Sequence, residues 1–142
     1  METLSRKQQR FTRLIAQLIG EANVRGYALT FGEAYRSDEQ AEINALGGDK
    51  RWALCLSLQP QFPALAAAIN NNGKHGGISK SLHRKRLAVD FNVFKNGELL
   101  TDGAQFEDLG VYWEGLAPDC RWGGRFHSVD SNHFSVAHAG KA

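Results

Sequence analysis

The sequence predicts a small α+β domain in which a mixed or antiparallel sheet is flanked by helices. Apolar residues recur at helical spacing near the start of the chain, while two later stretches alternate with the period of a half-buried strand. Asn96-Gly97 is the residue pair that most favours a tight hairpin, which joins antiparallel strands. A chain of 142 residues can bury one core, so residues 1–142 are expected to form a single domain.

The first third of the chain is expected to contain a helix, a strand and a second helix. Residues 4–24 carry an apolar stripe opposite Arg and Gln, which predicts an amphipathic helix. Residues 27–31 alternate and predict a strand. Ser37 followed by Gln40 has the spacing of a capping box, so a helix is expected from Ser37 to about Leu46.

The middle of the chain gives one helix and one loop. Residues 49–59 have an apolar centre but predict no particular element. Residues 60–72 predict a third helix that packs through small side chains. Residues 70–77 are rich in Asn and Gly, which predicts a loop. His75 in this loop is either a metal ligand or a solvated side chain.

The second half is expected to supply two strands that carry chemistry. From residue 87 onward Val89 and Phe91 share one face while Asp90 lies on the other, which predicts a half-buried strand. Residues 106–116 predict a fourth helix. Residues 133–137 predict a last strand with His133 on its less apolar face. Two such strands side by side would bring Asp90 and His133 within reach of one ion.

Composition excludes several classes of function. A net charge of +2 gives no indication of a general nucleic-acid binder, although the basic run at residues 83–86 could favour an anionic polymer such as a bacterial wall. No apolar run approaches the ~18 residues needed to cross a bilayer, so no membrane insertion is expected. The early apolar stretch lacks the features of a secretory signal. Cys55 and Cys120 are expected to be buried free thiols.

Two imidazoles and a carboxylate are the strongest indication of a site. His83, Asp90 and His133 are the ligand types of a catalytic zinc ion that keeps its fourth position open for water. His83 precedes Asp90 by seven residues, a distance over which a loop can fold back. Asp130 could then act as general base toward the bound water. Taken alone, the same pattern also fits histidines that bind no metal and make their hydrogen bonds within a core or a turn.

Arg36 is expected at a strand-to-helix junction. From there its guanidinium could bind a substrate carboxylate or a developing oxyanion. The alternative is a surface ion pair with Glu33 or Glu39, and the spacing favours the two interpretations equally.

Several linked motifs resemble those of the M15 family of zinc peptidases. The residues that carry the resemblance are Ser81-Leu82-His83 with Ala88 and Asp90, which match SxHxxxxAxD, and Trp122-Gly123-Gly124-Arg125-Phe126 with Asp130 and His133-Phe134, which match WGGxF…DxxHF. The resemblance covers residues 27–137 in order and is nearest to the single-domain phage endolysins. It implies a fold like that of the Hedgehog and D-alanyl-D-alanine peptidase domains.

The resemblance also implies roles for individual residues. It implies one Zn²⁺ ion bound by His83, Asp90 and His133, with Asp130 as catalytic acid and base and Arg36 in contact with the substrate or transition state. The family more often has Glu at the position of Asp130, which shortens the base here by one methylene. Many members have Gly where this chain has Arg86, which adds positive charge near the cleft.

Ser81, Trp122 and Gly123 are the expected substrate contacts within these motifs. Glycine at position 123 would let the backbone approach an extended stem peptide. The alternative is that the glycines only make a turn that positions Asp130 and that Trp122 belongs to the core. His127 is close enough in sequence to be a second partner or an alternative ligand.

The function implied by the resemblance is that of a zinc-dependent peptidoglycan hydrolase of the phage endolysin type. It would cleave an amide bond of the stem peptide, with L-alanyl-D-glutamate endopeptidase activity expected. A D-alanyl-D-alanine carboxypeptidase is one alternative, and a non-catalytic, zinc-stabilised wall-binding module is another. Such an enzyme would act on bacterial peptidoglycan as a monomer. Without a signal peptide it would wait in the host cytoplasm until lysis and then reach the periplasm and cell wall.

Overall fold

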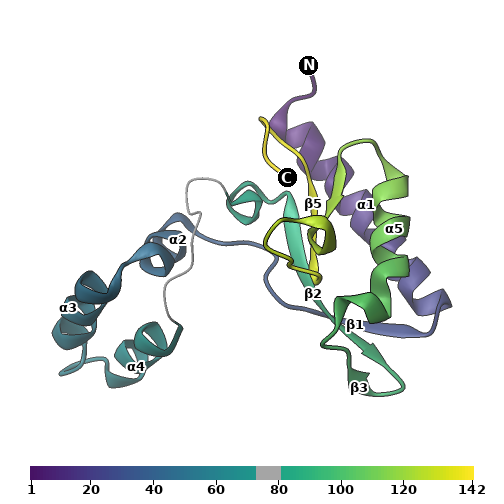
Figure 1. The fold of residues 1–142 in the computed structure, drawn as a ribbon. Coiled ribbons are helices and arrows are strands. Elements are labelled where there is room, and N and C mark those ends of the chain that lie inside the picture. Colours follow the sequence, from purple (N-terminus) through teal and green to yellow (C-terminus); the bar gives the residue numbers. More distant parts are fainter. Residues whose placement is uncertain (73–80) are drawn as a thin grey trace.

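The computed structural model describes residues 1–72 and 81–142, so His75 lies outside the described residues. Within these ranges the chain forms five α-helices and a five-stranded sheet, which confirms the predicted α+β class (Figure 1). The strands are β1 (Tyr27–Phe31), β2 (Ala88–Lys95), β3 (Glu98–Leu99), β4 (Cys120–Trp122) and β5 (His133–Val136). The α-helices are α1 (Leu4–Val24), α2 (Asp38–Ala45), α3 (Gly48–Leu58), α4 (Pro63–Asn72) and α5 (Glu107–Leu116).

The sheet is organised around β2, its longest strand. β1 pairs with one part of β2, β5 pairs with residues 88–90, and β3 pairs with the end of β2 through the predicted hairpin. β4 completes the sheet on the far side of β5, and every one of these pairings is antiparallel. Asn96 and Gly97 both have positive φ, 53° and 81°, which is the backbone that a tight two-residue hairpin requires.

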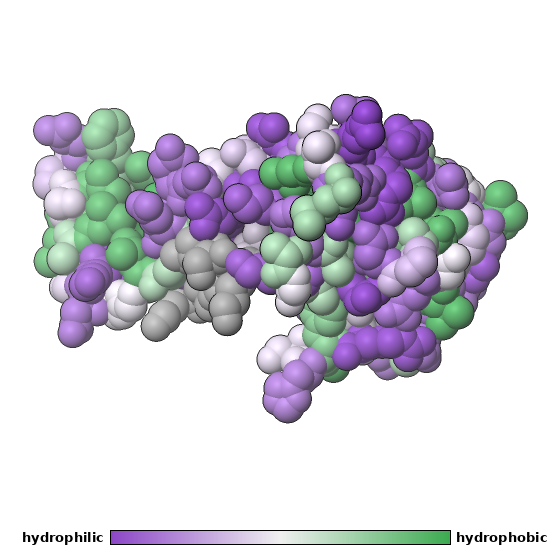
Figure 2. Space-filling model, turned by 90° about the horizontal axis from the view of Figure 1, so that it is seen from above, coloured by the Kyte–Doolittle hydropathy of each residue, from purple (hydrophilic) through white to green (hydrophobic). Residues whose placement is uncertain are grey.

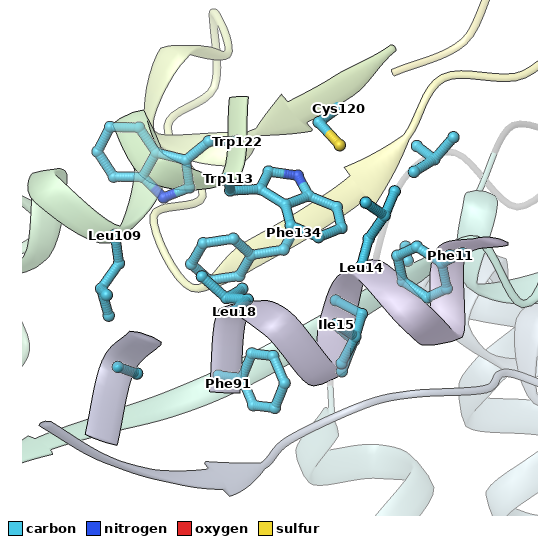
Figure 3. Packing of buried hydrophobic residues seen from close by; sticks show 14 of the residues in the cluster. Phe11, Leu14, Ile15, Leu18, Phe91, Leu109, Trp113, Cys120, Trp122 and Phe134 are labelled. Carbon is cyan, nitrogen blue, oxygen red and sulfur yellow. The ribbon is translucent and has the colours of Figure 1, made fainter. Parts of the chain in front are cut away.

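Helices α1 and α5 cover one face of the sheet and form the main core with it (Figure 3). Phe91 of β2 and Phe134 of β5 point toward Leu18 of α1 and Trp113 of α5, and all four side chains are almost fully buried. Because side chains alternate along a strand, the residues next to these, Asp90 and His133, project from the opposite face. The helices therefore leave that face of β2 to the polar residues.

Two elements were not predicted, and two predicted features differ in detail. α3 covers the stretch for which the sequence predicted nothing, and β4 has only three residues, too few to show a period. The third predicted helix begins at Pro63 rather than at residue 60, in keeping with the preference of proline for the first turn. Ser37 caps α2 as expected, but the Gln40 amide donates to Asn44 instead of completing a capping box.

The last strand forms at His133–Val136, within the predicted residues 133–137. His133 and Ser135 lie on its less apolar face, and Phe134 and Val136 lie on the other. In the structure all four residues of β5 are buried, and Ser135 has no exposed surface. Phe134 and Val136 belong to the main core, while on the other face Ser135 Oγ donates to Arg121 O and His133 lies against Asp90 and His83.

The remaining helices form a separate group beside the sheet (Figure 1). We call residues 37–72, with α2, α3 and α4, the helical lobe, and residues 1–36 with 81–142 the sheet body. The lobe has a small core of its own, made of Cys55, Ala66 and Ile69. Apolar side chains also gather on its surface (Figure 2), where Trp52, Leu56, Phe62 and Leu65 are all about half exposed.

Two expectations from composition can be compared with the structure. Cys55 and Cys120 are both buried and free, as expected. Burial raises the pKa of the Cys120 thiol to about 11. Among the described helices, none combines the length and the apolar character that crossing a bilayer demands.

Candidate metal centre

His83, Asp90 and His133 converge on one point, as the sequence predicted. His133 Nδ1 lies 3.0 Å from Asp90 Oδ1, and His83 Nε2 lies 3.2 Å from His133 Nδ1 and 3.3 Å from Asp90 Oδ1. The side chains of His83 and His133 are 6% and 9% exposed, against 20% for Asp90. This buried group could hold a metal ion.

The fold brings the three side chains together by two separate devices. Asp90 and His133 are direct partners in the antiparallel ladder of β2 and β5. His83 lies in η2 (Leu82–Lys85), a single 3₁₀ turn that precedes β2. Arg86 ends this turn in the left-handed conformation, with φ of 54°, and its N–H donates to the carbonyl of His83. The turn therefore folds His83 back over the strand that carries Asp90.

The distances fit a single ion better than a set of hydrogen bonds. A tetrahedral centre with bonds near ~2.0–2.1 Å places its ligand atoms about 3.3–3.4 Å apart, close to the separations of 3.0, 3.2 and 3.3 Å found here. With Asp90 ionised, the two rings supply at most one proton each toward the centre, so at most two of the three contacts can be hydrogen bonds. One cation would satisfy all three atoms at once.

The charge state of Asp90 suits a ligand. Burial raises its pKa, but hydrogen bonds from His133 and His83 outweigh this effect and lower the pKa to about 2. His83 Nδ1 is buried, and no described residue accepts from it or donates to it. Leaving a buried polar atom unpaired costs roughly 1–3 kcal/mol.

Asp130 lies at the exposed side of the three ligands. Its Oδ2 is 3.9 Å from His133 Nδ1, and its side chain is 54% exposed. Two backbone hydrogen bonds hold it there: Asp130 N–H donates to Gly123 O at 2.9 Å, and His133 N–H donates to Asp130 O at 3.0 Å. Partial burial, followed by the negative charge of Asp90, raises the pKa of Asp130.

Arg36 takes Glu33 as its ion-pair partner, which settles one of the alternatives left by the sequence. Arg36 Nε donates to Glu33 Oε1 at 2.6 Å, and Nη2 donates to Oε2. The pair is nevertheless close to the ligands, because Arg36 N–H donates to His83 O at 3.5 Å and Asp90 N–H donates to Glu33 O at 2.8 Å. Arg36 can thus be both an ion-pair partner and a neighbour of the site.

The proposed substrate contacts occupy different environments. Trp122 is 4% exposed and belongs to the main core, with its Nε1 donating to Ser131 O at 2.6 Å. A Cβ at Gly123 would lie only 2.1 Å from Asp130 O, so glycine is needed for the loop that carries Asp130 to approach. Ser81 is half-buried at the start of η2. Direct contact of these three residues with a substrate stays a prediction.

His127 does not join the three ligands. It is exposed, and the candidate ligand group consists of His83, Asp90 and His133 alone among the described residues.

Sequence reasoning missed a cleft that reaches Asp130. It has a volume of about 540 Å³, and its polar lining includes Asn92, Thr101, Asp102 and Asn132. Asn92 lies on the same face of β2 as Asp90, two residues further along, so the strand period could have indicated it. Thr101 and Asp102 follow the β2–β3 hairpin, and only the folded chain brings them to Asp130.

No protein-family model matches this chain, and no curated protein matches it. The resemblance to zinc peptidases therefore rests on the motifs and on the site geometry alone.

Proposed function

We propose that this protein is a zinc-dependent hydrolase that cleaves an amide bond in the stem peptides of bacterial peptidoglycan. The observation that carries the proposal is the triangle of ligand atoms from His83, Asp90 and His133, with the exposed carboxylate of Asp130 beside it. Three protein ligands and a fourth, free position are typical of catalytic rather than structural zinc. The two nitrogens and one oxygen are donors that zinc accepts well.

The neighbouring side chains supply the rest of a hydrolytic mechanism. Zinc bound here would act as a Lewis acid toward the scissile carbonyl and would lower the pKa of a coordinated water. Asp130 would take a proton from the attacking water and deliver it to the leaving amine. Arg36 would donate hydrogen bonds to the carbonyl oxygen as negative charge develops on it. No side chain is required to form a covalent intermediate.

The shape and charge near the site favour an endopeptidase. The cleft beside Asp130 gives an extended peptide room to continue past the site, which cleavage of an internal bond requires. The exposed basic residues Lys85 and Arg86 lie two and three positions after His83 and suit an anionic wall polymer. These features support the L-alanyl-D-glutamate bond type implied by the resemblance.

Digestion of purified muropeptides, followed by mass spectrometry, tests the proposal. The zinc-loaded protein should release one defined amide fragment, and chelation should abolish the release. Asp130→Asn should retain zinc while turnover falls roughly 10²–10⁴-fold. Asp49→Asn, an exposed carboxylate of the helical lobe, is the matched control and should keep activity within a few-fold. Hydrolysis that survives chelation would exclude the metal mechanism.

The alternatives give different results with whole cells. An endopeptidase should clear a suspension of permeabilised bacteria, because it breaks the wall network. A D-alanyl-D-alanine carboxypeptidase should trim muropeptides without clearing. A non-catalytic wall-binding module should sediment with peptidoglycan equally well as wild type and as Asp130→Asn, and should release no fragment.

A further inference from the structure

The Glu33–Arg36 pair has a geometry that an ordinary surface ion pair does not need. Both hydrogen bonds come from one edge of the guanidinium, the edge formed by Nε and Nη2. Arg36 is largely buried, with 16% of its side chain exposed. A guanidinium has five N–H donors in a fixed plane, so the edge between Nη1 and Nη2 still offers two parallel donors. In the described part of the chain, Nη1 makes no hydrogen bond.

The backbone fixes this pair relative to the candidate ligands. Asp90 N–H donates to Glu33 O and Gly32 N–H donates to Asp90 O, both at 2.8 Å, which locks the start of the segment onto β2. At its other end Arg36 N–H donates to His83 O at 3.5 Å. The segment from Gly32 to Arg36 is thus attached to two of the three ligands.

The charges agree with this placement. The hydrogen bond from Arg36 to Glu33 is the largest cause that raises the pKa of Arg36, and the negative charge of Asp90 adds to it. Glu33 also compensates a cation that would otherwise be buried without a counterion.

We propose that Glu33 is a positioning residue: its carboxylate holds the Arg36 guanidinium side-on, so that the Nη1–Nη2 edge is presented to the substrate carbonyl oxygen. The proposal rests on the proposed function and deepens it. Glu33 touches neither metal nor substrate and acts only through Arg36. An i,i+3 ion pair without this role would contribute to stability and nothing to turnover.

A double-mutant cycle separates positioning from a structural contribution. With a defined muropeptide substrate, Glu33→Gln should lower kcat roughly 100-fold with little change in KM. The reason is that a misplaced Arg36 would weaken its hydrogen bond to the carbonyl oxygen mainly in the transition state. Arg36→Ala should lower kcat roughly 10²–10³-fold. The double variant should be no slower than Arg36→Ala, because Glu33 has nothing left to position.

Two further variants control for charge and folding. Glu39→Gln removes an exposed acid three residues after Arg36 and should keep kcat within about two-fold. Glu33→Asp keeps the charge but withdraws the carboxylate by one methylene, and it should give an intermediate loss even if Glu33→Gln folds poorly. Independent, multiplicative losses in the double variant, or full activity of Glu33→Gln, would overturn the proposal.

A second readout does not depend on turnover. In ¹⁵N NMR the Nε–H of Arg36, assigned by its loss in Arg36→Lys, should exchange slowly with solvent in the wild type and much faster in Glu33→Gln. Glu39→Gln should leave it slow. Unchanged exchange in Glu33→Gln would show that Glu33 does not hold the guanidinium. If the wild type cleaves no muropeptide, the proposed function fails, and the exchange measurement still decides whether Glu33 holds Arg36.

Discussion

The sheet body and the helical lobe are held together in different ways. In the body, strands far apart in sequence pair through β2, and two helices bury a single large core against them. In the lobe, α3 and α4 form a small core from Cys55, Ala66 and Ile69, Ile43 of α2 packs against it, and large apolar side chains remain on the surface. All three candidate ligands belong to the body. A site that must hold atoms within a few tenths of an ångström thus lies in the region with the larger core.

Arg51 shows how the lobe compensates for its small core. Its side chain is 5% exposed and donates to the backbone carbonyls of Asn44, Leu46 and Ile69. One buried guanidinium thus connects all three helices of the lobe. The comparison indicates a body stabilised mainly by apolar burial and a lobe that depends more on hydrogen bonds to a buried cation.

The largest expected effect is the loss of a ligand in the body. His83→Ala should abolish activity and should weaken zinc binding by more than the ~10–100-fold typical of residues that only support a ligand. His127→Ala, which removes an exposed imidazole outside the ligand group, should bind one zinc ion as the wild type does. Isothermal titration with metal analysis of the dialysed protein measures both. Equal zinc affinity in the two variants would show that the three residues are not the metal site.

Core truncation should separate the two regions. Leu18→Ala removes a fully buried side chain from the body and should lower the free energy of unfolding by roughly 3–5 kcal/mol. The same variant should bind zinc more weakly. Ile69→Ala should cost roughly 2–3 kcal/mol at the lobe and leave zinc affinity unchanged. Urea unfolding measures the first quantity and titration the second.

The exposed positions Val24 and Leu65 supply matched controls on α1 and α4. Val24→Ala and Leu65→Ala should each change stability by less than about 0.5 kcal/mol. Loss of zinc binding in Ile69→Ala would show that the lobe and the body unfold together.

Removing the buried cation should loosen the lobe alone. Arg51→Met keeps most of the side-chain volume but leaves three carbonyls without their donor, which should cost roughly 1.5–3 kcal/mol. Hydrogen exchange should accelerate in α2, α3 and α4 and stay slow in β2 and β5. The neighbouring, exposed Lys50→Met is the control and should leave exchange unchanged.

The smallest expected effect is the loss of stability when a pH-dependent ion pair is removed. This pair joins α1 to the residue that precedes β4. Arg10 donates to both carboxylate oxygens of Asp119, at 3.0 and 2.7 Å, and chiefly this contact lowers the pKa of Asp119. Since the folded pKa is depressed, the stabilisation is present above the unfolded value near ~3.9 and is lost as pH falls through the folded value.

Asp119→Asn should therefore cost up to about 1 kcal/mol at pH 7. Its urea midpoint should approach that of the wild type in strong acid. A cost that does not shrink on acidification would mean that the ion pair is not its cause. Glu98→Gln, at an exposed position of the hairpin, should cost little at either pH.

Local patterns in the sequence determined much of the body. The apolar stripe of residues 4–24, the period-two run that carries Asp90 and the Asn96-Gly97 turn each depend on neighbours along the chain, and each element formed where it was predicted. The strand period also predicted which face Asp90 and His133 occupy, whereas His83 was predicted from its place in a preceding loop and from the motif resemblance. α3 and β4 escaped prediction because neither shows a clear period on its own.

Only the folded chain decided how these pieces meet. The register that sets Asp90 opposite His133, the choice of Glu33 as partner for Arg36 and the cleft beside Asp130 all join residues from separate segments. Burial of both faces of β5 has the same origin, since it follows from the segments that pack on the two faces of the sheet rather than from the strand's own residues. A sequence pattern specifies which side chains of one element share a face. The distances between side chains of different elements are fixed by packing, and packing depends on the whole chain.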